Sequence, residues 1–100
     1  MEITADGATL VLQGDLDGRS TWDVRMAIYD HLEHHGHVVL DMSGVELIDL
    51  TALKLIAVAT RRAAAEGHHL TLRGCTPSVR RMLHLSRMRR MVEVEHAVPA

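Results

Sequence analysis

Apolar residues along the chain switch between two spacings, and the switches predict alternating strands and helices. Helical spacing occupies about 21–35, then 50–65, and a further segment that begins at Pro77. Short β-prone apolar runs occupy 8–12, 37–41, 69–73 and 91–94, and Ile3 indicates an additional edge strand. The predicted order is strand, strand, helix, strand, helix, strand, helix, strand.

The predicted helices carry recognisable start residues. Ser20 or Thr21 suits the N-cap of the first helix, and Asp49 suits that of the second. Thr76 suits the N-cap of the third, because Pro77 then takes the first helical position, where proline is favoured. The helical residues expected to face the core are Val24, Ile28, Tyr29, Leu32, Leu53, Ile56, Ala57, Thr60 and Ala64.

The strand pattern predicts the class of fold. Asp6–Gly7 forms a turn that joins the first two strands into a hairpin. The run 37–41 hardly alternates, which predicts a strand buried on both faces, followed by a loop with Ser43 and Gly44. Strands separated by single helices pair in parallel through right-handed crossovers. We therefore expect one α/β domain over residues 1–100, with a mixed sheet of four to five strands, an N-terminal hairpin and three helices packed on it.

Composition narrows the class of partner. The 100 residues are 47% hydrophobic, mostly aliphatic, and carry a formal net charge of −2, so no overall field attracts nucleic acid or membranes. No apolar run approaches the ~18 residues of a membrane span. Cys75 is the single cysteine, and no leader is visible after Met1, so we expect the cytoplasm.

One stretch resembles a known family. Residues 38–49, Val-Val-Leu-Asp-Met-Ser-Gly-Val-Glu-Leu-Ile-Asp, resemble the central signature of STAS domains, which occur in sulfate transporters and anti-sigma-factor antagonists. Residues 14–17 resemble that family's Gly-acidic-aliphatic-Asp turn, and the likeness runs from about Leu10 to Val94. The resemblance implies the mixed sheet expected above and a regulatory role as an anti-sigma factor antagonist. Its partner would be an anti-sigma factor, often a GHKL-type serine kinase.

The chain departs from the family pattern where that kinase acts. The family has a Ser or Thr after the signature Asp, and its phosphorylation breaks the partner interface through repulsion and desolvation. Here Leu50 follows Asp49, and Thr51 lies one residue further, about 100° round a helix. The phosphorylation switch is therefore not transferred to Leu50, and Thr51 is the remaining candidate acceptor.

The resemblance places the partner surface on two segments. Its residues are Asp15, Leu16, Asp17, Arg19, Ser43, Gly44, Asp49, Leu50, Thr51, Ala52 and Leu53. In one interpretation, Leu50 at the acceptor position makes the domain a constitutive antagonist. The alternative is an accessory or scaffold subunit, as in lipid-transport ATPases or stressosome-like assemblies. A homodimer through the same exposed apolar residues also stays open.

Other chemistry receives less support. His31 and His35 have a spacing that can chelate zinc, but no Cys or carboxylate partner is fixed near them, and we expect no metal or cofactor. The serines show no nucleophile elbow and the glycines no phosphate loop, so we expect no enzyme. The basic residues Arg80, Arg81, Arg87, Arg89 and Arg90 form a solvated face or meet an acidic partner or a phosphate. Without interleaved aromatics they do not indicate nucleic acid.

Overall fold

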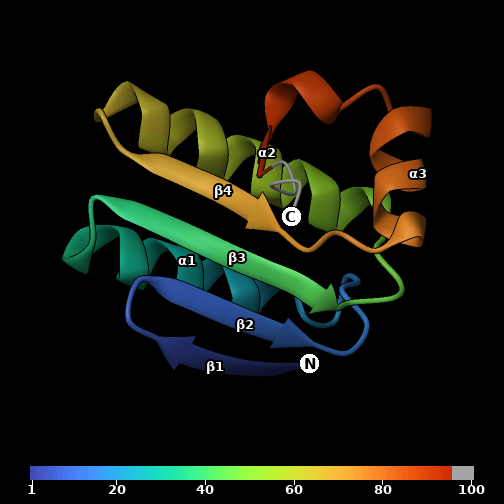
Figure 1. Cartoon of the computed structure of the whole chain (residues 1–100), viewed down its shortest axis with the longest axis horizontal. Coiled ribbons are helices and arrows are strands. Elements are labelled where there is room, and N and C mark those ends of the chain that lie inside the picture. The colour runs from blue at the N-terminus through green and yellow to red at the C-terminus, as the bar shows by residue number, and fades with distance from the viewer. Residues whose placement is uncertain (96–100) are drawn as a thin grey trace, which may run out of the picture.

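The computed structural model describes residues 1–95 and shows one five-stranded sheet in the order β1-β2-β3-β4-β5 (Figure 1). The strands are β1 (Glu2–Asp6), β2 (Thr9–Gln13), β3 (His37–Gly44), β4 (His69–Arg73) and β5 (Glu93–Val94). β1 and β2 form an antiparallel hairpin, and every other neighbouring pair is parallel. The predicted mixed sheet and its hairpin are confirmed.

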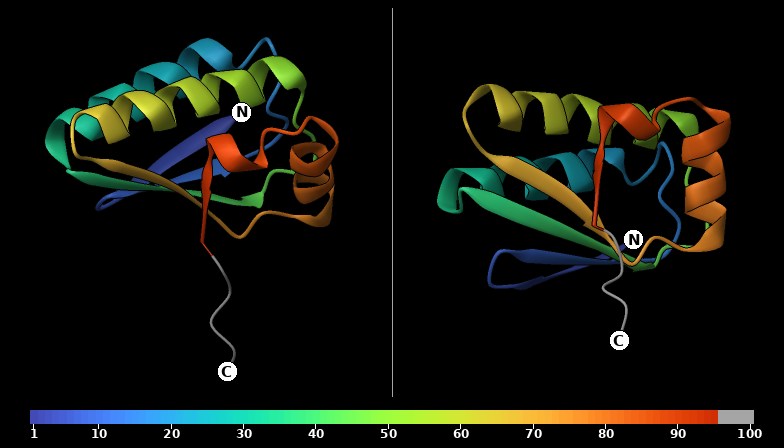
Figure 2. Two further views of the ribbon diagram at one scale, coloured as in Figure 1. Left: turned by 90° about the horizontal axis from the view of Figure 1, so that it is seen from above. Right: turned by 45° about the horizontal axis from the view of Figure 1, so that its top comes forward.

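Helices α1 (Thr21–His34) and α2 (Leu50–Ala65) lie side by side on one face of the sheet, and α3 (Pro77–Leu85) lies at its carboxyl edge (Figure 2). The strand register explains why the helices cover that face. Leu10 is paired with Leu40, and Leu40 with Leu72, so a continuous apolar row crosses three strands. All three side chains are buried, and the helices contribute Val24, Ile28, Leu32, Leu53 and Ile56 to the same core. Burial of this row and of the helix stripes supplies the main driving force for folding.

The expectation that β3 is buried on both faces is wrong. Its outer-face residues His37 and Ser43 are exposed and Asp41 is half-buried. Only Val39 is buried on that face, because it pairs with Thr9 of β2 on one side and with Thr71 of β4 on the other. The sequence of this central strand is therefore almost continuously apolar, although the described helices cover only one face of the sheet.

Several predicted boundaries and contacts also change. β3 continues through Ser43 to Gly44, because the Gly14 amide donates to the Gly44 carbonyl at 3.0 Å. The last strand is limited to Glu93–Val94, since a short 3-10 helix, η1 (Arg89–Met91), precedes it. Ala64 is exposed and Tyr29 half-buried, whereas the other expected core positions of α1 and α2 are buried.

Two of the predicted helix caps are confirmed. Asp49 caps α2 by accepting from the Ala52 amide, and Thr76 caps α3 by accepting from the Val79 amide. Ser20 occupies the N-cap position of α1 but makes no capping hydrogen bond. Its hydroxyl instead bonds within the preceding turn.

Candidate functional site

The two segments of the expected partner surface lie against each other. The Leu16 amide donates to the Leu47 carbonyl at 2.8 Å, and the Asp49 amide donates to the Leu16 carbonyl at 3.1 Å. Leu16 and Ile48 thereby form an isolated parallel bridge beyond the ends of β2 and β3, whose carboxyl ends are adjacent (Figure 1). A backbone ladder therefore holds residues 15–20 beside the start of α2.

Asp49 joins these segments through its side chain. One carboxylate oxygen, Oδ1, accepts from the Ala52 amide at 2.8 Å, and Oδ2 accepts from the Gly18 amide at 3.1 Å. The first bond satisfies an amide that α2 leaves unpaired at its N-terminus. The second fixes the neighbouring turn. The carboxylate expected as a cap is thus also a bridge between the two segments.

The turn before α1 is organised by its own polar side chains. Asp17 accepts from the Arg19 amide at 2.9 Å and from the Arg19 guanidinium at 3.1 Å. The Arg19 side chain holds the pKa of Asp17 below its ordinary value, and the Arg19 backbone amide adds to that effect. The Ser20 hydroxyl accepts from the Asp17 amide and reaches the carbonyls of Asp15 and Asp17. These hydrogen bonds therefore hold the turn in one conformation.

The loop between β3 and α2 is anchored from both sides. Ser43 donates from its amide and its hydroxyl to Asp41 Oδ1, at 3.0 and 2.6 Å, and the hydroxyl bond is the main cause that lowers the pKa of Asp41. On the other side the Thr76 hydroxyl donates to the Val45 carbonyl at 2.9 Å. Val45 and Ile48 are buried, so the loop rests on the core.

The start of α2 divides into a surface pair and a buried pair. Leu50 is 46% exposed and Thr51 is exposed. Ala52 and Leu53, which the resemblance placed in the partner surface, are fully buried, and so is Leu16 of the neighbouring turn. They pack in the core beneath the surface and supply no contact area to a partner. Leu50 is therefore the apolar side chain that this end of α2 presents.

Sequence reasoning did not identify several further exposed apolar side chains, which lie on α1, on α2 and just before α2. Leu47, Trp22, Met26 and Val58 are between 50% and 66% exposed. A groove of about 360 Å³ runs between α1 and α2, and it is lined by Thr21, Trp22, Arg25, Tyr29, Thr51, Lys54, Leu55, Val58 and Arg62. Apolar residues on the outer side of both helices were the available signal. A groove lined in part by exposed apolar side chains such as Trp22 and Val58 is typical of a protein-binding surface.

The remaining candidates lie apart from this surface. His31 and His35 stack with ring centroids 5.2 Å apart, and residues 1–95 contain no group of three His, Cys, Asp or Glu side chains placed to hold a metal ion. Cys75 is buried, and burial raises the pKa of its thiol. Over the described part of the chain, no helix has the length and apolarity needed to cross a membrane.

The fold and this site can be compared with known proteins. The family model described as Mlab, STAS domain, matches residues 1–93. The chain belongs to the STAS domain family. The resemblance seen in residues 38–49 is thereby confirmed.

Solved structures share this STAS fold at low sequence identity. An anti-sigma factor antagonist from Mycobacterium paratuberculosis aligns with a TM-score of 0.76 and 19% identity, over 97% of this chain and 85% of that chain. Unphosphorylated SpoIIAA, also an anti-sigma factor antagonist, aligns with a TM-score of 0.72 and 17% identity, over 95% of this chain and 87% of that chain. The murine anion transporter Slc26a9 aligns with a TM-score of 0.72 and 18% identity, over 90% of this chain and 16% of that chain. Regulators and a transporter share the fold, so the role depends on the surface.

Proposed function

We propose that this STAS domain is a non-enzymatic regulator of transcription, an anti-sigma factor antagonist that binds an anti-sigma factor through Leu50 and its surroundings. The observation that carries the proposal is Leu50 itself, an exposed apolar side chain at the start of α2. The likeness to SpoIIAA and to the mycobacterial antagonist supports the general role. The role implies the cytoplasm, where sigma factors act.

The surface is suited to binding because it is held in place before a partner arrives. The Asp49 bridge, the Leu16 backbone bonds and the Asp17–Arg19 pair fix both segments in the free domain. A preorganised surface loses little conformational entropy on association, so more of the contact energy appears as affinity. Exposed Leu47 beside Leu50 enlarges the apolar centre, and Asp15 and Arg19 supply a polar rim.

Leu50 also determines how the interaction is regulated. SpoIIAA has been solved in unphosphorylated and phosphorylated forms, and the family resemblance implies a hydroxyl after the signature Asp. Leu50 has no hydroxyl, so no phosphate is added at that position. A serine-kinase type of anti-sigma factor would bind this domain without switching it off there. We therefore propose a constitutive antagonist.

A second function is favoured by a different observation. The family model that matches residues 1–93 is described as Mlab, STAS domain, rather than by an anti-sigma factor antagonist. A permanent apolar contact at Leu50 equally suits an accessory or scaffold subunit, as in a lipid-transport ATPase or a stressosome-like assembly. Both functions use the same surface, and they differ in the partner that occupies it.

The test is a pull-down from native lysate, read by mass spectrometry, with wild-type protein, Leu50→Asp and Leu85→Asp. A new Asp in the first turn of α2 interacts favourably with the helix dipole, so Leu50→Asp keeps the fold. Leu85 is 65% exposed on α3 and lies outside the proposed surface, so its variant controls for added charge. We expect Leu50→Asp to weaken partner binding about tenfold or more, as for a central interface residue, and Leu85→Asp to bind normally.

The identity of the partner separates the functions. An anti-sigma factor that is captured by wild type and lost with Leu50→Asp supports the antagonist. ATPase-transporter subunits or other STAS proteins lost in the same way support the accessory subunit. A dimer seen by light scattering at rising concentration, and abolished by Leu50→Asp, assigns the surface to self-association. Equal capture by wild type and Leu50→Asp removes this surface from both proposals.

A further inference from the structure

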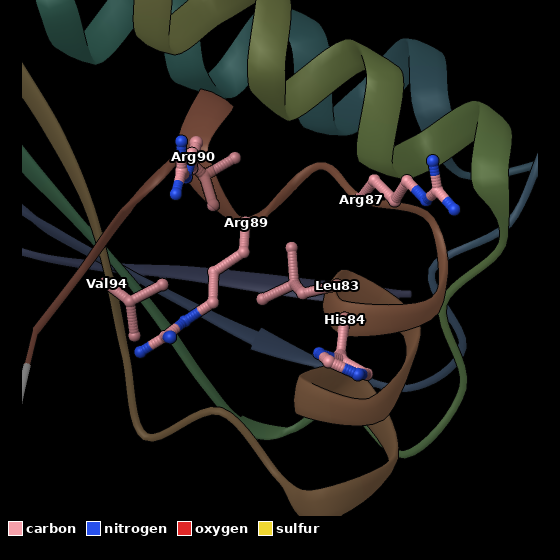
Figure 3. Close-up of a pocket in the computed structure, with 7 residues that line it drawn as sticks. Leu83, His84, Arg87, Arg89, Arg90 and Val94 are labelled. Atoms are coloured by element: carbon pink, nitrogen blue, oxygen red, sulfur yellow. The ribbon is translucent and has the colours of Figure 1, made fainter.

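A basic pocket lies at the carboxyl end of α3, between that helix, η1 and β5 (Figure 3). Its volume is about 630 Å³, and its lining residues are Leu83, His84, Arg87, Arg89, Arg90, Val92 and Val94. It shares no residue with the surface around Leu50. Volumes of this size are typical of small-molecule sites, which lie between about 300 and 1,000 Å³.

The side chains divide the pocket into a basic rim and an aliphatic floor. Figure 3 shows Arg89 extending between Leu83 and Val94, with His84 across the same space and Arg87 and Arg90 at the upper edge. The Leu83 and Val92 side chains are buried at 2% and 7% exposure, so they form a fixed apolar surface beneath the charges. The pocket therefore combines cationic donors with apolar contact area.

The charges of this rim are not neutralised within residues 1–95. No ion pair of the described residues involves the three arginines. The carboxylates of the adjoining strand have other partners, since Glu93 contacts His69 at 3.1 Å and Glu95 contacts Arg73 at 2.9 Å. Three arginines therefore line one hollow, and their positive charges attract an anion that binds there.

The backbone at Arg87 adds an independent observation. Arg87 has φ of 61°, the one non-glycine residue among residues 1–95 with a positive φ. Its amide donates to the His84 carbonyl and the Met88 amide donates to the Leu83 carbonyl, so α3 ends in a Schellman motif. Glycine is the usual residue at that left-handed position, because it has no Cβ to strain. An arginine is held there at a conformational cost, and Arg87 is one of the residues that line the pocket.

We propose that this pocket binds a small phosphate ester. Guanidinium groups present paired N–H donors that match phosphate oxygens, and arginine is preferred wherever such paired recognition is needed. His84 adds a further donor across the pocket. The lining apolar residues are aliphatic, so the organic part of the ester contacts methyl groups and does not stack on an aromatic ring. The phosphate belongs either to a soluble metabolite or to a lipid headgroup, and the chemistry recognised is the same.

The experiment is an NMR titration of the ¹⁵N-labelled full chain at constant ionic strength. Glycerol 3-phosphate and ATP probe soluble esters, and small vesicles with phosphatidylglycerol, compared with vesicles of phosphatidylcholine alone, probe a headgroup. The variants are Arg89→Gln, which removes one donor set, and Arg87→Gly, which removes another while relieving the backbone. Arg81→Gln on α3 removes the same charge from a residue that does not line the pocket.

We expect saturable shifts confined to residues 83–94, and a loss of affinity of about tenfold for each of Arg89→Gln and Arg87→Gly, the size of one charge-assisted hydrogen bond. Arg81→Gln should bind as wild type does. Saturation by a soluble ester assigns a metabolite, and binding to anionic vesicles alone assigns a headgroup. The proposal is overturned if no probe gives saturable shifts at millimolar phosphate, if the shifts lie elsewhere, or if Arg81→Gln weakens binding as much as Arg89→Gln. None of these outcomes depends on the partner of Leu50, so this proposal and the proposed function fail separately.

Discussion

Asp49 links helix capping to the geometry of the proposed binding surface, and two substitutions separate its bonds. Asp49→Ala removes both the bond to the Ala52 amide and the bond to the Gly18 amide. Asn is as good an N-cap as Asp, so Asp49→Asn keeps an oxygen for the Ala52 amide. Its NH₂ group cannot accept from Gly18, so this variant loses the bridge alone.

The magnitudes follow from the two bonds. Loss of an N-cap costs about 1 kcal/mol of unfolding free energy, and loss of one further hydrogen bond costs about 1 kcal/mol. We expect Asp49→Ala to lower the unfolding free energy by about 2 kcal/mol and Asp49→Asn by about 1 kcal/mol. For a domain of this size, these losses lower Tm by roughly 10 °C and roughly 5 °C.

The assay is urea and thermal unfolding followed by circular dichroism, with amide hydrogen exchange of Gly18. Asp15→Ala is the matched control, because the Asp15 side chain is exposed and makes no hydrogen bond within residues 1–95. Faster exchange at Gly18 is expected in both Asp49 variants. Equal losses of unfolding free energy for Asp49→Ala and Asp49→Asn, or no loss for Asp49→Ala, would refute the separate roles assigned to the two carboxylate oxygens.

Three further predictions concern the loop and the core. Gly44→Ala places a Cβ within 2.9 Å of Gln13 Cγ, so we expect a loss of about 1–3 kcal/mol in urea unfolding; wild-type stability would contradict the close strand contact. Because Ser43 lowers the pKa of Asp41, the stability gained from that bond is present above the ordinary carboxyl pKa and is lost as pH falls through the folded pKa. The difference in unfolding free energy between wild type and Ser43→Ala, measured by urea unfolding, should therefore be present at pH 7 and become smaller below about pH 4. A difference that does not depend on pH would contradict this. Cys75 is buried with a raised pKa, so a thiol reagent should modify it at the rate of unfolding; rapid reaction of the native protein would show an accessible thiol.

The parts of the fold that were predictable depend on local chemistry. Asp49 and Thr76 cap their helices as expected, because each side chain reaches an amide two or three residues ahead in any helix start. The apolar stripes of α1 and α2 were readable for the same reason, since helical spacing alone brings those side chains to one face. The mixed sheet then follows from the order of the elements.

The parts that were missed depend on tertiary contacts. Ser20 has the side chain of a cap, but its hydroxyl is used by the carbonyls of Asp15 and Asp17. Val39 looks like one residue of a doubly covered strand, yet its strand neighbours bury it. The groove between α1 and α2 and the basic pocket arise where separate elements meet, and the strand and helix patterns do not carry that information.

Thr51 is the remaining candidate acceptor of a phosphate, and its surroundings predict how a negative charge there changes the stability of the domain. Its side chain lines the groove between α1 and α2 together with Lys54, Arg25 and Arg62. The hypothesis is that a negative charge on Thr51 is attracted by these cations and by the N-terminus of α2, so it stabilises the free domain. Thr51→Glu should therefore raise Tm by a few degrees, with the gain reduced in high salt, whereas Thr51→Gln should not. A lower Tm for Thr51→Glu would place the residue in a repulsive environment and refute the hypothesis.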